Sequence, residues 1–317
     1  MTKTITLTAA ALVASFALAQ LGSAQAVPGG VQRSLQSGGL TRSYLQVVPA
    51  ACKRATARCA VVFGFHGGGV PGVSGAQFDR QTGLGKAALE RGFIAIMPDG
   101  RARNWNDGRP EVREKADDVG FVKVIIAAMK ADGLAIDPKR VFATGMSNGG
   151  HMSFRLACEM PDTFTAVAPV VASLGVALSA QCPAGKPISI LNIVGTADPL
   201  TPYLGGKISL NNGPSRGLVL SSDASMAFWR KANRCTGKPA MRRFDADPGD
   251  ETSVVVERYA SCARGKVLER YTVVGGGHLW PGEFPKGFVA RISGRPTKEF
   301  KATEVILDFF GIPKPIG

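Results

Sequence analysis

The sequence predicts an α/β protein built on a mainly parallel central sheet, with helices on both faces. Short β-rich runs alternate with helix-like stretches, which is the pattern of this class. Several of those runs are almost continuously apolar, as expected for strands that helices cover on both faces. With 317 residues, 45% hydrophobic and 20% charged, the chain is long enough for one large α/β domain with a substantial core.

The expected strands follow these apolar runs in chain order. Each is short and is bounded by glycine, proline or polar residues, which favour turns. They cover residues 44–48, 59–65, 93–97, 141–144, 166–171, 188–194 and 267–274.

The expected helices occupy the stretches between those strands. Asp117 is the predicted N-cap of the second helix, and Asp132-Gly133 its exit. Segments 207–215 and 245–252, rich in Gly, Pro or Asp, are expected as surface loops. No linker composition divides the chain, so we expect a single catalytic domain over residues 27–317. The helices are expected at residues 76–91, 118–131, 148–159, 223–233 and 301–310.

The N-terminal 26 residues have the composition of a secretory signal peptide. Lys3 precedes an apolar run over residues 5–18, and Ala24-Gln25-Ala26 forms an A-x-A exit. The alternative is a membrane anchor, but the run is short for a span and no basic stop-transfer cluster follows it. We expect a mature chain that begins at Val27 and is secreted, either extracellular or periplasmic.

Cysteine content agrees with export. The six cysteines permit 15 pairings, among which sequence alone does not choose. We expect sequential pairing (52–59, 158–182 and 235–262), because each bond would brace a local excursion between core elements. The alternative is free buried thiols, which are rare in exported chains.

The charge of +14 is spread along the chain. No basic stripe or nucleic-acid-binding module is present, so nucleic acid is not an expected partner. A diffuse positive surface would attract acidic polymers weakly. Three histidines and the absence of a C-x-x-C pair also argue against a metal site.

The strongest local motif is Gly145-Met146-Ser147-Asn148-Gly149. It lies directly between an expected strand and an expected helix, which is the context that the G-x-S-x-G nucleophile turn requires. The turn would present the hydroxyl of Ser147 above the sheet. Ser147 is therefore the candidate nucleophile.

A second motif, His66-Gly67-Gly68-Gly69, follows the expected strand 59–65. Backbone N–H groups of Gly67 and Gly68, together with that of Asn148, would form an oxyanion hole for the reacting carbonyl. The alternative is an ordinary glycine turn. The nucleophile motif downstream favours the catalytic interpretation.

A nucleophilic serine needs a base, and a histidine base needs an orienting carboxylate. Asp198 and His278 each follow the end of an expected strand, in the chain order Ser, acid, His. His66 and His151 are weaker candidates for the base, since His66 lies in the oxyanion loop and His151 one helical turn beyond Ser147.

Three aromatic residues lie in loops expected near this site. Trp105, Tyr203 and Trp280 could line an acyl or aromatic pocket. Packing that holds those loops together is an equally good interpretation.

Together these motifs resemble the secreted esterases grouped with polyhydroxybutyrate depolymerases and with feruloyl and acetylxylan esterases. The resemblance implies an α/β-hydrolase fold and places nucleophile, acid and base on Ser147, Asp198 and His278. The family's polyester depolymerases usually carry a separate polymer-binding domain, and many have a cysteine in the oxyanion loop, which reads His-Gly-Gly-Gly in this chain. Both departures favour soluble esters or oligomers. The matching stretches are 65–69, 98–100, 105–109, 117–121, 145–156, 195–203, 275–282 and 302–310.

The predicted function is a secreted serine carboxylic-ester hydrolase that needs no cofactor or metal. Its expected substrates are feruloyl- or acetyl-type esters of plant cell-wall xylan, or hydroxybutyrate oligomers. One alternative is a serine peptidase like prolyl oligopeptidase, although no gating domain is visible in the sequence. Another is a non-catalytic envelope or carbohydrate-binding protein with a hydrolase fold, although the triad and the oxyanion glycines are all present. Membrane insertion is not expected of the mature chain.

Overall fold

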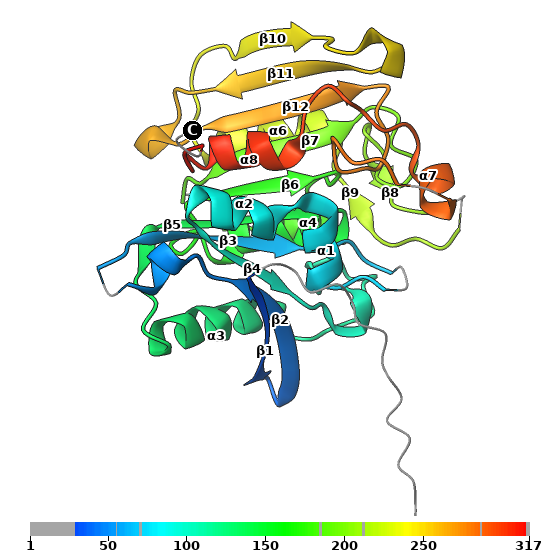
Figure 1. The fold of residues 1–317 in the computed structure, drawn as a ribbon. Coiled ribbons are helices and arrows are strands. Elements are labelled where there is room, and N and C mark those ends of the chain that lie inside the picture. The colour runs from blue at the N-terminus through cyan, green and yellow to red at the C-terminus, as the bar shows by residue number, and fades with distance from the viewer. Residues whose placement is uncertain are drawn as a thin grey trace, which may run out of the picture.

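The computed structural model describes residues 29–54, 56–69, 72–183, 186–210, 213–285 and 287–314. Within them, one sheet has the strand order β1-β2-β4-β3-β5-β6-β7-β12-β11-β10 (Figure 1). The six strands from β4 to β12 are parallel, and antiparallel pairs flank them at both edges. The predicted α/β class with a mainly parallel sheet is confirmed. The strands are β1 Gly30–Ser37, β2 Leu40–Val47, β3 Cys59–Phe65, β4 Ile94–Pro98, β5 Ile136–Met146, β6 Ala166–Val170, β7 Ser189–Gly195, β10 Ala240–Phe244, β11 Ser253–Tyr259 and β12 Leu268–Val274.

Helices cover both faces of this sheet. Alternate residues of a strand point to opposite faces, and in β3 Val61 and Phe63 join one core cluster while Val62 joins the other. The first cluster includes side chains of α3, α4 and α6, and the second includes side chains of α1, α2 and α8. These helices are α1 Gly75–Thr82, α2 Leu84–Arg91, α3 Asp118–Ala131, α4 Asn148–Glu159, α6 Ser222–Ala232 and α8 Ala302–Phe309.

The structure corrects the expected elements in several places. The single helix expected over 76–91 is two helices, because Gly83 adopts φ 67°, ends α1 and caps the start of α2. The short helices α5 (Val176–Gln181) and α7 (Phe288–Ser293) were not expected. Neither were the outer strands β1, β10 and β11, nor the small hairpin of β8 (Gly206–Lys207) and β9 (Leu218–Val219). In β1 and β10 most residues are exposed or half-exposed, so no apolar run marks them.

All three expected disulfides are present. Cys52 is bonded to Cys59, Cys158 to Cys182 and Cys235 to Cys262. The sequential pairing is therefore confirmed, and the free-thiol alternative is wrong. Such bonds persist in oxidising compartments outside the cytoplasm.

Within the described part of the chain, no helix combines the length and the apolar character needed to cross a bilayer. The predicted signal peptide, residues 1–26, lies outside the described residues.

Candidate active site

The three candidate catalytic residues follow the carboxyl ends of three parallel strands. Ser147 comes directly after β5, Asp198 follows β7 and His278 follows β12. In the sheet, β6 separates β5 from β7, and β7 and β12 are neighbours (Figure 1). Carboxyl ends of parallel strands lie at one edge of the sheet, where α/β proteins bind their ligands.

Ser147 occupies a strained turn between β5 and α4. Its φ of 56° and ψ of −118° are unfavourable for a residue with a side chain. The turn is held by hydrogen bonds from the Ser147 N–H to the Val170 carbonyl and from the His151 N–H to the Ser147 carbonyl, both 2.9 Å. A Cβ atom at Gly149 would collide with the carbonyl oxygen of Phe65 in β3. The motif glycine is thus required by the close approach of neighbouring backbone.

Asp198 and His278 form a buried pair. His278 Nδ1 lies 2.8 Å from Asp198 Oδ2, and the two side chains are 6% and 2% exposed. The other carboxylate oxygen accepts hydrogen bonds from the backbone N–H groups of Leu200 and Thr201, both 2.8 Å. Because an ionised carboxylate only accepts, this contact requires the proton on Nδ1 and leaves Nε2 as an acceptor.

Backbone contacts join the loops that carry the acid and the histidine. The N–H of Ala197 donates to the carbonyl of Gly276 (3.0 Å), and the N–H of Gly275 donates to Oγ1 of Thr196 (2.9 Å). The N–H of His278 itself donates to the Ser293 carbonyl (2.6 Å). The relative position of Asp198 and His278 is thus set by the backbone as well as by their own contact.

The glycine loop predicted as part of an oxyanion hole lies against the nucleophile turn. A Cβ on Gly67 would be 3.7 Å from the Cβ of Ser147, and one on Gly68 would be 2.9 Å from Oδ1 of Asn148. The structure therefore brings Gly67, Gly68 and Asn148 together beside Ser147.

His66 and His151 are buried and have structural surroundings. His66 Nε2 accepts the N–H of Gly100 at 2.9 Å, and its Nδ1 lies 2.6 Å from the Gly67 carbonyl. Burial lowers the pKa of His66. Burial and the charge of Arg109 lower the pKa of His151 to about 3. Both rings are therefore neutral at physiological pH.

Two of the three aromatic candidates are buried in the core. Trp105 is fully buried, and its indole N–H donates to the His66 carbonyl at 2.9 Å. Trp280 is 2% exposed, packs edge-to-face on Phe78 and donates to Thr303 Oγ1 at 3.2 Å. The substrate-contact interpretation is wrong for both, since a buried ring offers no surface to a substrate. Tyr203 is half-buried and stays a prediction.

Sequence reasoning missed a buried ion pair beneath Asn148. Asp107 and Arg109 are 1% and 5% exposed, and Arg109 Nε lies 3.0 and 3.1 Å from the two carboxylate oxygens. Burial alone would raise the pKa of Asp107, but the Arg109 guanidinium and its hydrogen bonds outweigh burial and hold that pKa below its usual range. Asn148 Nδ2 donates to Asp107 Oδ2 at 2.6 Å. The segment matches the family motif at 105–109, but its burial is visible only in the fold.

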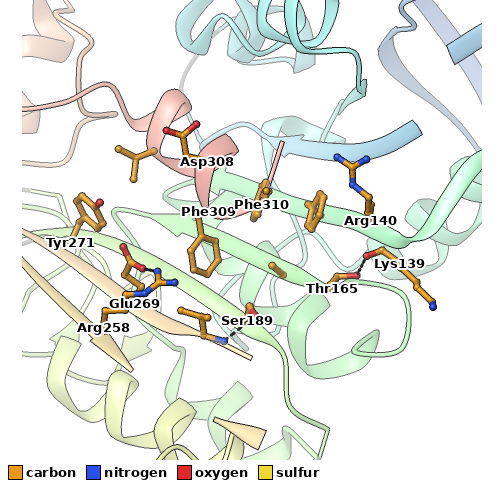
Figure 2. Close-up of a pocket in the computed structure, with 15 residues that line it drawn as sticks. Lys139, Arg140, Thr165, Ser189, Arg258, Glu269, Tyr271, Asp308, Phe309 and Phe310 are labelled. Atoms are coloured by element: carbon orange, nitrogen blue, oxygen red, sulfur yellow. Dashed lines mark hydrogen bonds and ion pairs between the residues drawn. The ribbon is translucent and has the colours of Figure 1, made fainter. Parts of the chain in front are cut away.

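A cavity of about 510 Å³ opens at the amino ends of the parallel strands, opposite the end that carries Ser147, Asp198 and His278 (Figure 2). Arg140, Thr165 and Ser189 line it near the starts of β5, β6 and β7, with Phe309 of α8 beside them. Arg140 lies within β5, seven residues before Ser147, about 23 Å away at the usual rise per residue. This cavity is therefore separate from the candidate active site.

Groups of three or more His, Cys, Asp or Glu side chains suited to a metal ion do not occur among the described residues. The chemistry available at the site is that of a serine hydroxyl, an imidazole paired with a carboxylate, and backbone N–H donors.

Comparison with known proteins identifies the family. NocK of Nocardia uniformis subsp. tsuyamanensis, provisionally named an esterase, is 31% identical over 289 residues, which are 87% of this chain and 81% of NocK. The chain belongs to an esterase family. Feruloyl esterase B of Piromyces equi is 31% identical over 211 residues, which are 65% of this chain but 37% of that protein. The chain is thus an enzyme of the carboxylic ester hydrolase class, related to feruloyl esterases.

The fold of this esterase is shared with a solved structure. The acetyl xylan esterase of Aspergillus awamori matches it with a TM-score of 0.58 and 13% identity, over 90% of this chain and 100% of that one. At this identity the likeness shows the fold alone. No family model matches the chain. The relatives named here include no polyhydroxybutyrate depolymerase, so that part of the resemblance stays a prediction.

Proposed function

We propose that this esterase is a secreted serine esterase that hydrolyses feruloyl- or acetyl-type esters of plant cell-wall xylan through an acyl-enzyme. The observation that carries the proposal is the strained Ser147 turn, at the same sheet edge as the buried Asp198–His278 pair. A strained strand-to-helix turn is how hydrolases of this fold expose a nucleophilic hydroxyl.

In the first half of the reaction, Ser147 Oγ attacks the ester carbonyl carbon while Nε2 of His278 takes the hydroxyl proton. Negative charge develops on the carbonyl oxygen and is stabilised by the N–H groups of Asn148 and of the glycine loop, each donor contributing about 3 kcal/mol. Asp198 holds the tautomer and stabilises the imidazolium. The carbon–oxygen bond to the alcohol then breaks, and the alcohol leaves with the proton from His278.

In the second half, water attacks the acyl-enzyme. His278 takes a proton from the water, and the bond from Ser147 Oγ to the acyl carbon breaks as the proton returns to the serine. The products are a carboxylic acid and a free enzyme, so neither a metal nor an organic cofactor takes part in this mechanism.

The feruloyl part of the substrate class is supported by the relative from Piromyces equi, which is named a feruloyl esterase. The solved structure of the same fold is named an acetyl xylan esterase. Secretion is supported by the three disulfides and by the N-terminal composition, so we assign residues 1–26 to a signal peptide and 27–317 to one catalytic domain. Tyr203, half-buried five residues beyond Asp198, is the remaining candidate for a substrate contact.

The test is ester hydrolysis by the purified mature protein, with methyl ferulate and a hydroxybutyrate trimer compared side by side. Ser147→Ala is the blank. We expect turnover of methyl ferulate that disappears in the variant. Preference for the trimer would move the substrate to hydroxyalkanoate oligomers, and full activity of Ser147→Ala would disprove the nucleophile. A peptide substrate run in parallel tests the peptidase alternative, for which we expect no cleavage.

A further inference from the structure

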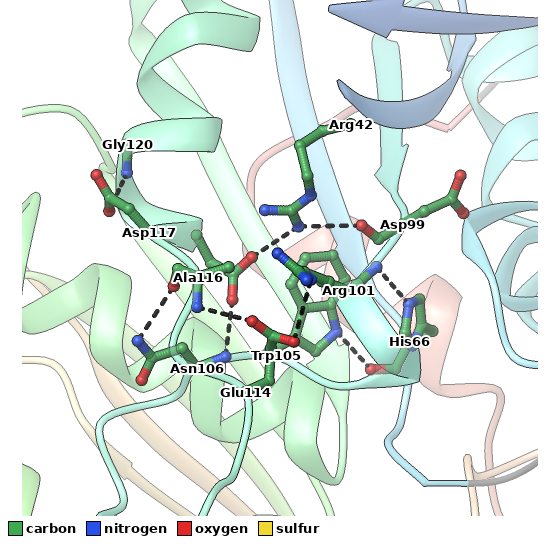
Figure 3. A network of polar contacts seen from close by, with 12 residues as sticks. Arg42, His66, Asp99, Arg101, Trp105, Asn106, Glu114, Ala116, Asp117 and Gly120 are labelled. Atoms are coloured by element: carbon green, nitrogen blue, oxygen red, sulfur yellow. Dashed lines mark hydrogen bonds and ion pairs between the residues drawn. The ribbon is translucent and has the colours of Figure 1, made fainter. Parts of the chain in front are cut away.

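Residues 100–109, called here the 100–109 loop, connect the two parts of the proposed oxyanion hole. One part is the 66–69 loop, and the other is the nucleophile turn with Asn148. Figure 3 shows Arg101, Trp105 and Asn106 of this loop near His66, and the ring of Trp105 is a neighbour of the His66 ring. The loop contacts the 66–69 loop and the Asn148 side chain through different atoms.

The loop holds the 66–69 loop at both ends. At the first end, His66 accepts the Trp105 indole N–H on its carbonyl and the Gly100 N–H on its ring, both at 2.9 Å. At the other end, the N–H of Gly69 donates to the Arg103 carbonyl at 3.0 Å. Between these anchors, the N–H groups of Gly67 and Gly68 have no acceptor among the described residues. Donors held in place but left unpaired are what an oxyanion site requires.

The same loop grips the side chain of Asn148. Asn148 Oδ1 accepts the Trp105 N–H at 2.7 Å, and its Nδ2 donates to the Trp105 carbonyl at 3.0 Å. Nδ2 also donates to Oδ2 of Asp107 at 2.6 Å. Trp105 therefore contacts both parts of the site, with its indole on one side and its backbone on the other.

Charged side chains contact this loop on both sides. Asp107 pairs with Arg109, as described above, and Arg155 donates to the Asn106 carbonyl at 2.6 Å. On the other side of the loop, the Asn106 N–H donates at 2.7 Å to Asp118, which pairs with buried Arg42 at 2.7 Å (Figure 3). Side chains locked in this way hold their neighbours in one geometry.

We infer that Trp105 and Asp107 are positioning residues, which set the distance between the N–H donors of the 66–69 loop and that of Asn148. This inference rests on the proposed function. Neither side chain touches the substrate. Each affects the energy of the transition state through the N–H donors that it positions. A misplaced donor weakens the contact with the oxyanion more than it weakens substrate binding.

The test variant is Trp105→Phe, which keeps an aromatic ring and both backbone contacts but removes the indole donor to His66. The matched control is Trp229→Phe, since Trp229 is equally buried, stacks on Phe154 and has no hydrogen-bond partner for its indole N–H among the described residues. Active enzyme is counted by the amplitude of labelling with a fluorophosphonate, so that loss of folded protein does not count as loss of rate.

For Trp105→Phe we expect kcat on methyl ferulate to fall about 10-fold per active site, less than the loss of a whole donor. KM should stay within about twofold, since ground-state binding is unchanged. The fluorophosphonate labelling rate should fall in parallel, and the pH profile should keep its midpoint because His278 is untouched. Trp229→Phe should match the parent in all four measurements.

A second variant, Asn148→Ala, keeps the backbone N–H and deletes every side-chain contact with the 100–109 loop, so it should show the same pattern. Parent-like kcat in both Trp105→Phe and Asn148→Ala would overturn the inference and leave the proposed function intact. An equal fall in Trp229→Phe would also overturn it, because the effect would then be general to the core. The proposed function would instead be overturned by two results together: the parent enzyme does not react with the fluorophosphonate, and Ser147→Ala keeps the activity of the parent.

Discussion

His278 Nδ1 lies 2.8 Å from Oδ2 of Asp198, while Oδ1 of the same carboxylate accepts two backbone N–H groups. The carboxylate is thus oriented by its own loop. Nδ1 of the imidazole faces Oδ2 of this carboxylate, and the contact selects the tautomer that leaves Nε2 unprotonated. Both groups are buried, so water competes little for this contact.

Replacing Asp198 by Asn should leave the fold intact and remove most of the activity. The amide oxygen can still accept the N–H groups of Leu200 and Thr201, but the amide nitrogen then faces Nδ1 and favours the wrong tautomer. We expect kcat to fall about 10³- to 10⁴-fold. Steady-state kinetics test this, with urea unfolding as the control for stability. Parent-like turnover would remove Asp198 from the triad.

Alanine at Gly67 and at Gly68, the two glycines proposed for the oxyanion hole, should lower kcat to very different extents. A Cβ at Gly67 meets nothing closer than 3.7 Å, whereas one at Gly68 would be 2.5 Å from Oδ1 of Asn104 and 2.9 Å from Oδ1 of Asn148. We expect Gly67→Ala to keep kcat within about threefold and Gly68→Ala to lose about 10- to 100-fold, because a displaced donor stabilises the oxyanion poorly. Equal effects would show that this packing does not control the donors.

His151 should make the protein less stable in acid. Its pKa is lowered to about 3 in the fold, whereas an unfolded chain binds the proton near pH 6.5. Between these values the unfolded state binds more protons, so the free energy of unfolding falls as pH falls, by about 1.4 kcal/mol per pH unit. Above about pH 6.5 the contribution is constant.

Urea unfolding at a series of pH values tests this, with His151→Gln as the comparison. The slope between pH 4 and 6 should be smaller in the variant by about 1.4 kcal/mol per pH unit, once the carboxylates common to both proteins cancel. Identical slopes would mean that His151 does not titrate in this way.

The disulfides should differ in their contribution to stability. The bond between Cys52 and Cys59 spans 7 residues, and that between Cys235 and Cys262 spans 27. Loop entropy then predicts losses of about 2.5 and 3.6 kcal/mol for the paired Cys→Ala variants. Urea unfolding of the two double variants under oxidising conditions measures this order. A larger loss for the shorter loop would show that native contacts outweigh chain entropy.

Features that depend on local sequence were predicted well. Helices α3 and α4 begin and end at the predicted residues, and Asp117 accepts the Gly120 N–H as the predicted cap. The disulfide partners, close in sequence, were also predicted. The nucleophile turn has the predicted strand–turn–helix context because its glycines and its periodicity are local properties.

Features that depend on distant contacts were not. The outer strands β1 and β10 are largely exposed, so hydrogen bonds to a neighbouring strand define them and apolar patterning does not. The helix expected over 76–91 divides at Gly83, where the packing of α1 and α2 on the sheet requires a bend that composition does not predict.

The sequence by itself determined the fold class and the strand-end positions of Ser147, Asp198 and His278. It allowed 15 cysteine pairings, and the tertiary structure decided that the predicted sequential one forms. Only the tertiary structure decided which residues are buried: Trp105 is a core residue that contacts the 66–69 loop, and Asp107 is a buried partner of Arg109 and Asn148. The reason is physical. Turn chemistry and hydrophobic periodicity are encoded within a few residues, whereas burial and hydrogen bonding depend on elements that meet only when the sheet has formed.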